Sequence, residues 1–178
     1  PRVWEKIQAK MIAAKAAAIA AGELSPTKLR ISEWGKGMSL EHAENRQLGG
    51  SGAKTSVFHG LVAEKLVQKG IKEKLGLECC KYAFTGAAPI AVETLRYFAS
   101  VGININEVYG MSECTGAATW STDRAHVWGS CGWALPGVEV KVFREGGNVE
   151  VPDCKDMFRP TEAEQGELCY RGRNIMMG

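Results

Sequence analysis

Two short segments of the chain combine residue types that can bind a flat ring and a phosphate. TGAAP at 85–89 consists largely of residues with almost no side chain, so a ring can lie directly against its backbone. VYGMSE at 108–113 adds Tyr109 for stacking, Gly110 for close approach of a ligand and the Ser112 hydroxyl for a phosphate oxygen. These two segments favour a nucleotide site.

Glu113 places a carboxylate beside the predicted phosphate position. A bare carboxylate repels a phosphate, so Glu113 is explained chiefly by a bridging Mg²⁺ ion. A purely structural interpretation stays open: GAAP is a common helix entry, and Ser112 or Glu113 could cap a following helix. The two segments together favour the nucleotide site but leave the reaction undefined.

Two apolar strands and one helix should position these segments. The strands are predicted at 79–84 and 103–108, and the helix at 90–101 begins near Pro89. Strand, helix and strand within about 30 residues form a βαβ unit with parallel strands. Because ligands bind where parallel strands end, we expect the two segments to lie side by side at neighbouring βα turns.

The rest of the first two thirds reads as helices and an irregular connection. Alanine-rich residues 3–21 and the amphipathic segment 61–75 predict helices, the second one interrupted near Gly70. The Gly-rich segment 33–56 predicts an irregular connection. Its GGSGAKTS sequence at 49–56 lacks the glycines that a phosphate loop requires, so no such loop is predicted there.

The last third is predicted to be rich in strands. Apolar and polar residues alternate at 138–143, EGGN at 145–148 suits a hairpin turn, and 167–171 forms another short strand. The predicted fold class is therefore α/β, with a parallel βαβ region followed by a mainly antiparallel portion. We expect residues 1–118 to form the α/β part of one domain and 119–178 its β-rich part.

Composition excludes several other classes of protein. The 178 residues are 45% hydrophobic and 24% charged, with a net charge of +2 and no basic block, so nucleic acid is not an expected partner. The basic helix at 3–21 presents mostly alanine on its apolar side, which favours a solvated helix over one lying on a membrane. The cysteines lack a CxxC pair or a zinc spacing, so we expect reduced thiols that lie mostly in the core: Cys79, Cys80, Cys114, Cys131, Cys154 and Cys169.

The same segments resemble motifs of a known superfamily. YGMSE at 109–113 resembles the Tyr-Gly-x-Ser/Thr-Glu motif of the adenylate-forming enzymes, which include acyl-CoA synthetases, luciferases and peptide-synthetase adenylation domains. FTGAAPI at 84–90 is similar to their adenine-contacting segment, and GELCYRGRNIMMG at 166–178 to their Gly-Glu-Leu…Arg-Gly…Met-x-Gly segment. Three stretches are most similar to long-chain fatty acyl-CoA synthetases, and among those to the bubblegum type: PRVWEKI at 1–7, CKYAFTGAAPI at 80–90 and VYGMSECTG at 108–116.

This resemblance implies a piece of the large N-terminal, AMP-binding domain of a fatty acid–CoA ligase. Such an enzyme uses ATP and Mg²⁺ to form an acyl-adenylate and pyrophosphate, and CoA then displaces AMP. The resemblance also implies that Tyr109 stacks on adenine, Ser112 contacts the α-phosphate region, Glu113 holds Mg²⁺ and 129–137 lies near the acyl side. The residues implied in nucleotide binding are Gly86, Ala87, Ala88, Pro89, Tyr109, Gly110, Met111, Ser112, Glu113 and Cys114.

The superfamily's phosphate loop, ribose-binding Asp and lid Lys find no match within residues 1–178. Catalytic residues are therefore not assigned, and we expect an internal fragment that is inactive alone. Two alternatives remain open: an adenylate-forming ligase for another carboxylic acid, and a non-catalytic nucleotide-binding module. We expect a cytoplasmic protein; peripheral association with a membrane such as the endoplasmic reticulum, acyl chain length and oligomeric state are left open.

Overall fold

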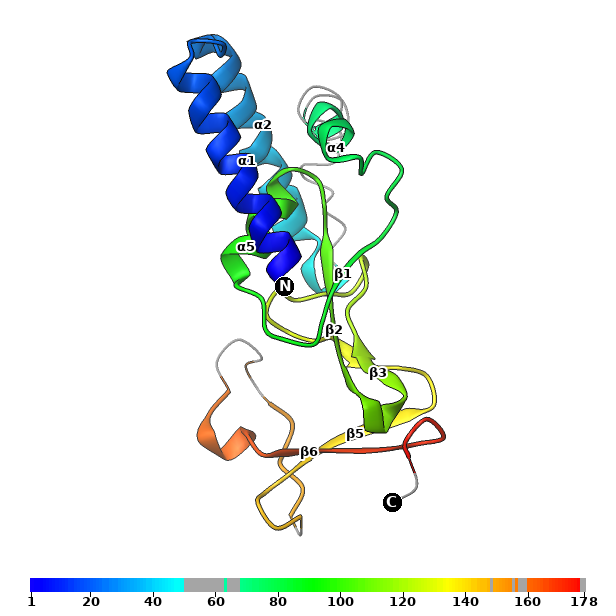
Figure 1. Cartoon of the computed structure of the whole chain (residues 1–178). Helices are drawn as coiled ribbons and strands as arrows, with labels where there is room; N and C mark the ends of the chain where they lie inside the picture. The colour runs from blue at the N-terminus through cyan, green and yellow to red at the C-terminus, as the bar shows by residue number, and fades with distance from the viewer. Residues whose placement is uncertain (50–62, 64–67, 148, 155, 157–159, 177–178) are drawn as a thin grey trace. The chain divides into compact units, whose positions relative to one another are not determined.

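In the computed structural model the chain forms two compact units (Figure 1). The first unit contains Pro1–Val108 and Ser121–Gly132, and the second contains Tyr109–Trp120 and Trp133–Gly178. The assignment of 1–118 and 119–178 as two parts of one domain stays a prediction. The residues that the structure describes are 1–49, 63, 68–147, 149–154, 156 and 160–176.

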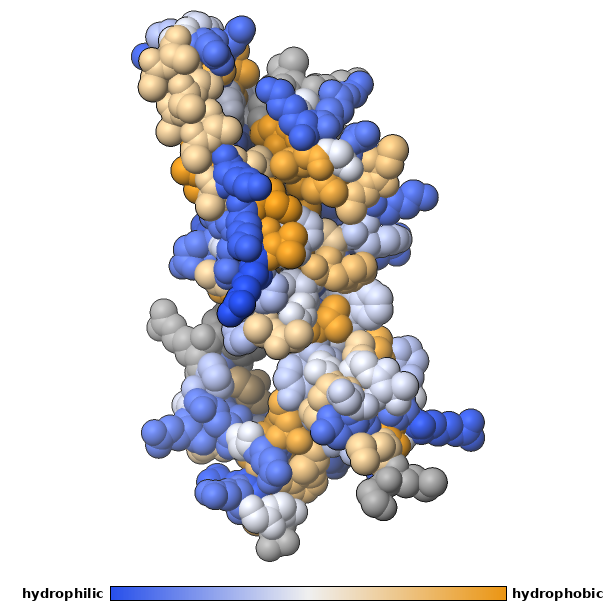
Figure 2. Space-filling view, viewed as in Figure 1, coloured by the Kyte–Doolittle hydropathy of each residue, from blue (hydrophilic) through white to orange (hydrophobic). Residues whose placement is uncertain are grey.

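The first unit contains the long helices α1 (Arg2–Ala20) and α2 (Pro26–Asn45), which run alongside each other (Figure 1). An ion pair between Lys15 of α1 and Glu33 of α2 joins them. The prediction of a helix over 3–21 is confirmed. Figure 2 shows hydrophilic side chains beside hydrophobic ones over α1. Among the described residues, no helix has the length and apolar character needed to cross a bilayer.

The predicted irregular connection over 33–56 is wrong as far as Asn45, because α2 covers that stretch. Ser25 caps this helix by accepting a hydrogen bond from the Lys28 N–H, and Pro26 is its first residue. Its buried positions are the small residues Gly35 and Ser39, so its core-facing side gives no apolar periodicity in the sequence. Residues 50–56, including most of GGSGAKTS, lie outside the described residues.

Helix α4 (Lys69–Leu75) confirms the end of the helix predicted over 61–75. The first part of that predicted helix, residues 61–62 and 64–67, lies outside the described residues. Gly70 itself lies within α4, which begins one residue earlier at Lys69. Of residues 61–68 the structure describes only 63 and 68, so the predicted interruption near Gly70 stays a prediction. The helix ends at Gly76, whose φ of 67° is the left-handed conformation common after a last helical turn.

The predicted βαβ unit is confirmed. Strand β1 (Ala83–Thr85) pairs in parallel with β2 (Ile105–Met111), with Ala83 opposite Ile105, and helix α5 (Val92–Ser100) forms the crossover. β1 is shorter than predicted, since residues 79–82 precede it. β2 continues three residues beyond its predicted end, and the sheet order is β1-β2-β3-β4 with β3 (Gly116–Trp120) and β4 (Trp133–Ala134).

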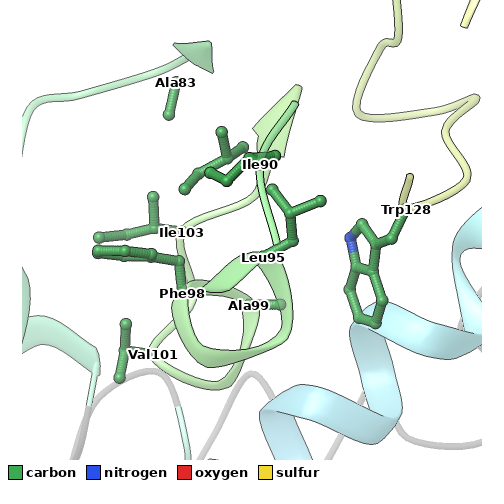
Figure 3. Close-up of a cluster of buried hydrophobic side chains, with 9 residues drawn as sticks. Ala83, Ile90, Leu95, Phe98, Ala99, Val101, Ile103 and Trp128 are labelled. Carbon is green, nitrogen blue, oxygen red and sulfur yellow. The ribbon is translucent and has the colours of Figure 1, made fainter. Parts of the chain in front are cut away.

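The hydrophobic core of the first unit is built around α5 (Figure 3). Phe98 and Leu95 are 0% and 1% exposed, and Val101 and Ile103 pack in the same cluster as the chain leaves the helix. Trp4 of α1 packs edge-to-face on Phe98, with ring centroids 5.0 Å apart. The apolar side of α1 therefore packs on the protein core.

The second unit contains the antiparallel pair β5 (Val138–Phe143) and β6 (Glu167–Gly172). Both predicted strands are confirmed. After β5 the chain reverses, with Arg144 N–H donating to the Val149 carbonyl at 2.8 Å, and Gly146 and Gly147 supply the positive φ angles of this turn. Asn148, the last residue of the predicted turn, lies outside the described residues.

The prediction that the cysteines lie mostly in the core is wrong. All six are free thiols, and only Cys114 is buried; Cys169 is half-buried and the other four are exposed. The four exposed cysteines lie in connecting segments between helices and strands. A cysteine side chain in such a segment is not buried merely because it is apolar. The mixed α/β fold class, with parallel strands followed by antiparallel ones, is confirmed.

Candidate nucleotide-binding site

The turn after β1 begins with Gly86, which lies against the neighbouring strand. A Cβ atom on Gly86 would lie 2.9 Å from the carbonyl oxygen of Val108 in β2. This distance is too short for an unstrained contact, so the sheet itself requires a glycine here.

Ala87 has a φ of 65°, a left-handed conformation that is uncommon for residues other than glycine. Ala87, Ala88 and Pro89 are all exposed, and α5 begins only at Val92. Residues 87–89 of TGAAP therefore lie in an exposed loop before the helix rather than in its first turn. A strained non-glycine residue in such a loop supports a functional role for the loop.

The second segment forms a tight turn between two strands. β2 ends at Met111, the 3₁₀ turn η3 (Ser112–Cys114) follows, Thr115 adopts a φ of 57° and β3 begins at Gly116. No helix follows, and neither Ser112 nor Glu113 makes a capping hydrogen bond from its side chain. The capping alternative is therefore wrong, and so is the expectation of two βα turns, since this one joins strand to strand.

The backbone packing of the second unit requires Gly110. A Cβ atom at this position would lie 1.8 Å from the Gly116 carbonyl oxygen and 2.7 Å from the Ala117 Cα. Gly110 thus lets the strands on both sides of η3 approach each other. A contact between Gly110 and a ligand stays a prediction.

The segment after β6 holds η3 in place through three hydrogen bonds. Asn174 donates from Nδ2 to the Cys114 carbonyl at 3.0 Å and accepts at its own carbonyl from Thr115 Oγ1 at 2.7 Å. The Met176 N–H donates to the Glu113 carbonyl at 2.8 Å. The backbone of the turn is fixed in this way, while the side chains of Ser112 and Glu113 are exposed.

Sequence reasoning found the segment that contains Asn174 and Met176 but gave these two residues no role. Their positioning contacts join residues about 60 positions apart, which spacing along the chain does not reveal. Tyr170 was also missed. Its ring stacks on Tyr109 with centroids 6.1 Å apart and planes at 16°, so Tyr170 covers one face of Tyr109 and an adenine ring would need the other.

The remaining residues of the second segment are less accessible. Met111 is half-buried, and Cys114 is 2% exposed. The Cys114 carbonyl also accepts the hydrogen bond from Asn174. The role of Cys114 in nucleotide binding stays a prediction.

Glu113 is an exposed carboxylate at the turn η3. In the part of the chain that the structure describes, no group of three or more His, Cys, Asp or Glu residues could hold a metal. Mg²⁺ in nucleotide sites is commonly bound by one or two carboxylates together with substrate phosphates and water. Glu113 fits a Mg²⁺ ion that arrives with a nucleotide, and it does not fit a metal held by protein groups alone.

Glu107, two residues before Tyr109, is a buried carboxylate in the first unit. It is 8% exposed, and its Oε2 accepts a hydrogen bond from the Gly129 N–H at 2.8 Å. Gly129 begins the 129–137 segment, so Glu107 fixes the start of that segment. Burial raises the pKa of Glu107, and the Gly129 N–H opposes this shift without cancelling it.

The raised pKa gives Glu107 a defined effect on stability. The folded state holds the proton more tightly than the unfolded state, so this contribution to stability is fully present below the unfolded-state pKa and is lost as pH rises through the folded-state pKa. In the full-length protein, Glu107→Gln should keep an acceptor for the Gly129 N–H. Because only wild type loses stability as Glu107 ionises, the thermal stability of Glu107→Gln relative to wild type should rise from about pH 5 to about pH 8. Thermal unfolding at both pH values measures this gain, with exposed Glu93→Gln as the control; a constant difference between Glu107→Gln and wild type would contradict the prediction.

Asn174→Ala should loosen the turn that carries Ser112 and Glu113. It removes the side-chain bond to Cys114, worth about 1 kcal/mol, and we expect nucleotide affinity of the full-length protein to fall by up to about tenfold. Titration with ATP and Mg²⁺ measures the affinity, and Arg173→Ala, an exposed neighbour, is the control. Equal affinities of Asn174→Ala and wild type would show that this bond does not position the turn.

The structure assigns the TGAAP turn to the first unit and residues 109–114 to the second. Their expected position side by side stays a prediction. Within the first unit, Gly86 contacts Val108, the residue that directly precedes Tyr109. The roles of the ten predicted nucleotide-binding residues likewise stay predictions.

Comparison with known proteins identifies the family to which the chain belongs. The model of the family described as "AMP-binding enzyme" matches residues 2–178, so the chain belongs to the AMP-binding enzyme family. This confirms the predicted relationship to adenylate-forming enzymes.

Among curated proteins, the chain is similar to long-chain-fatty-acid–CoA ligases. The chain is 36% identical to long-chain-fatty-acid–CoA ligase ACSBG2 of Xenopus laevis and 33% identical to long-chain-fatty-acid–CoA ligase heimdall of Drosophila melanogaster. Each comparison covers 100% of this chain, which spans 21% and 23% of the length of these relatives. Among solved structures, apo MatB from Rhodopseudomonas palustris is 31% identical with a TM-score of 0.43, over 55% of this chain and 18% of MatB.

Proposed function

We propose that the full-length protein that carries this chain is a long-chain fatty acid–CoA ligase. The fatty acid carboxylate attacks the α-phosphate of ATP and releases pyrophosphate, and the CoA thiol then attacks the acyl carbonyl and releases AMP. Family membership and the similarity to two long-chain-fatty-acid–CoA ligases support this proposal. The observation that carries it is the fixed turn η3, which presents Ser112 and Glu113 to solvent.

The chain's own groups would bind and orient the nucleotide. The exposed loop at Ala87 and Ala88 offers backbone groups to the edge of adenine, and Tyr109 offers the ring face that Tyr170 leaves open. Ser112 would donate its hydroxyl hydrogen to a phosphate oxygen, and Glu113 would hold Mg²⁺. When bound, Mg²⁺ neutralises charge on the phosphates.

ATP–pyrophosphate exchange by the full-length protein tests the proposal. Carboxylic acids of graded chain length are added one at a time, and we expect exchange that requires a long-chain acid. Exchange only with short-chain, aryl or amino acids would keep adenylation and exclude the proposed substrate. No exchange with any acid, from a folded protein that binds ATP, would favour a non-catalytic nucleotide-binding module. Location in the cytoplasm stays a prediction, whereas peripheral association with a membrane such as the endoplasmic reticulum and oligomeric state stay open.

A further inference from the structure

The first unit contains a pocket that the proposed reaction does not use. Its volume is about 470 Å³, within the range of small-molecule sites. Asn104 and Tyr82 line it at the amino ends of β2 and β1, whereas Gly86 follows the carboxyl end of β1. The pocket therefore lies at the opposite end of these strands from the TGAAP turn.

Three cationic residues from separate elements line this pocket. Arg46 follows the last turn of α2, Lys72 belongs to α4, and Lys81 lies in the segment before β1. None of the three forms an ion pair with a carboxylate among the residues that the structure describes. Cationic residues that line one pocket without carboxylate partners favour a bound anion.

Asp123 also lines the pocket, but amides engage its carboxylate. Its Oδ1 accepts hydrogen bonds from Asn104 Nδ2 at 3.0 Å and from Asn106 Nδ2 at 2.8 Å. Asp123 is thus held at the wall by neutral groups. With three cations and one carboxylate, the ionised groups that line the pocket carry a net positive charge.

A buried histidine gives independent evidence for a ligand. His126 lines the pocket and is 4% exposed. The backbone of Thr122 and Asp123 lies near its ring, but neither ring nitrogen makes a hydrogen bond of good geometry. The backbone of Thr122 and Asp123 favours the protonated ring, but burial has the larger effect and lowers the pKa of His126. A neutral imidazole still offers one N–H, and a buried polar group without a partner is costly.

We propose that this pocket binds the phosphate group of a small molecule. The Arg46 guanidinium suits the oxygens of a phosphate, Lys72 and Lys81 supply point charges, and His126 can donate its N–H. Because a phosphate fills only part of the pocket, the site has room for an organic group beside it. Tyr82, which lines the pocket with 66% of its surface exposed, supplies an aromatic ring for that group.

Titration of the full-length protein with inorganic phosphate, at constant ionic strength in a calorimeter, tests the proposal. We expect saturable binding that weakens about tenfold in Arg46→Gln and in Lys72→Gln, as for the loss of one charge-assisted hydrogen bond. Lys74→Gln is the matched control, because Lys74 is exposed in the same helix and does not line the pocket. Thermal unfolding of each variant confirms that it is folded.

Two results would overturn the pocket assignment. The first is the absence of saturable phosphate binding, or an equal loss in Lys74→Gln, which would indicate only a diffuse charge effect. The second is binding that Ser112→Ala abolishes and Arg46→Gln preserves, because the phosphate would then occupy the proposed nucleotide site. Since these variants separate the two sites, the proposed ligase activity can fail without affecting this result.

Discussion

Glu113→Gln in the full-length protein should lower acid-dependent ATP–pyrophosphate exchange by about 10²–10³-fold, as for the loss of one electrostatic group from a phosphate site. The amide keeps the size of the side chain but loses the charge that binds Mg²⁺. Since Glu113 is exposed and its backbone is held by Met176, the fold should be unaffected. Exchange rates measured over a range of Mg²⁺ concentrations should show a weaker apparent Mg²⁺ affinity.

The control for this prediction is Glu162→Gln, which removes an exposed carboxylate elsewhere in the second unit. It should leave exchange and its Mg²⁺ dependence unchanged. Normal exchange in Glu113→Gln would keep the reaction but rule out the role of Glu113 as a metal ligand. A similar loss in both variants would indicate a general effect of charge.

Gly110→Ala should destabilise the protein by about 3 kcal/mol or more, because overpacking against a rigid backbone cannot relax cheaply. The added Cβ would lie 1.8 Å from the Gly116 carbonyl oxygen, so the strands around η3 must move apart. Urea denaturation of the full-length protein measures the free energy of unfolding. The same displacement should weaken ATP binding, since it moves Ser112 and Glu113.

Gly37→Ala is the matched substitution with the opposite expected sign. Gly37 lies within α2, and a Cβ there would meet nothing within 4 Å. Alanine in a helix interior should stabilise by about 0.5–1 kcal/mol relative to glycine. If Gly110→Ala were tolerated as well as Gly37→Ala, the close approach of β2 and β3 described here would be wrong.

The sequence predicted the elements whose apolar pattern is local. The apolar residues of α5 and β2 and the alternation in β5 have clear periods, so the βαβ unit and the antiparallel pair could be predicted. Helix α2 could not, because Gly35 and Ser39 are its buried positions. The Ser25-Pro26 pair was the available signal for its start.

In the candidate site, too, the sequence predicted local features but not contacts between residues that lie far apart along the chain. Its exposed residues, Ser112 and Glu113, were recognised from their chemistry. The positioning contacts of Asn174 and the stacking of Tyr170 on Tyr109 depend on the return of the chain along β6, which no local pattern specifies. Gly110 was predicted to let a ligand approach the backbone, and this contact stays a prediction; the close neighbour that the structure shows is the Gly116 backbone.

Hydrogen–deuterium exchange of the full-length protein, with and without ATP and Mg²⁺, tests the central claim most directly. If TGAAP and η3 form one nucleotide site, peptides that cover 84–90 and 109–115 should both exchange more slowly when ATP is bound. Glu113→Gln should reduce the protection at 109–115. Protection confined to other parts of the protein, with both peptides unchanged at saturating ATP, would contradict the assignment of the nucleotide site.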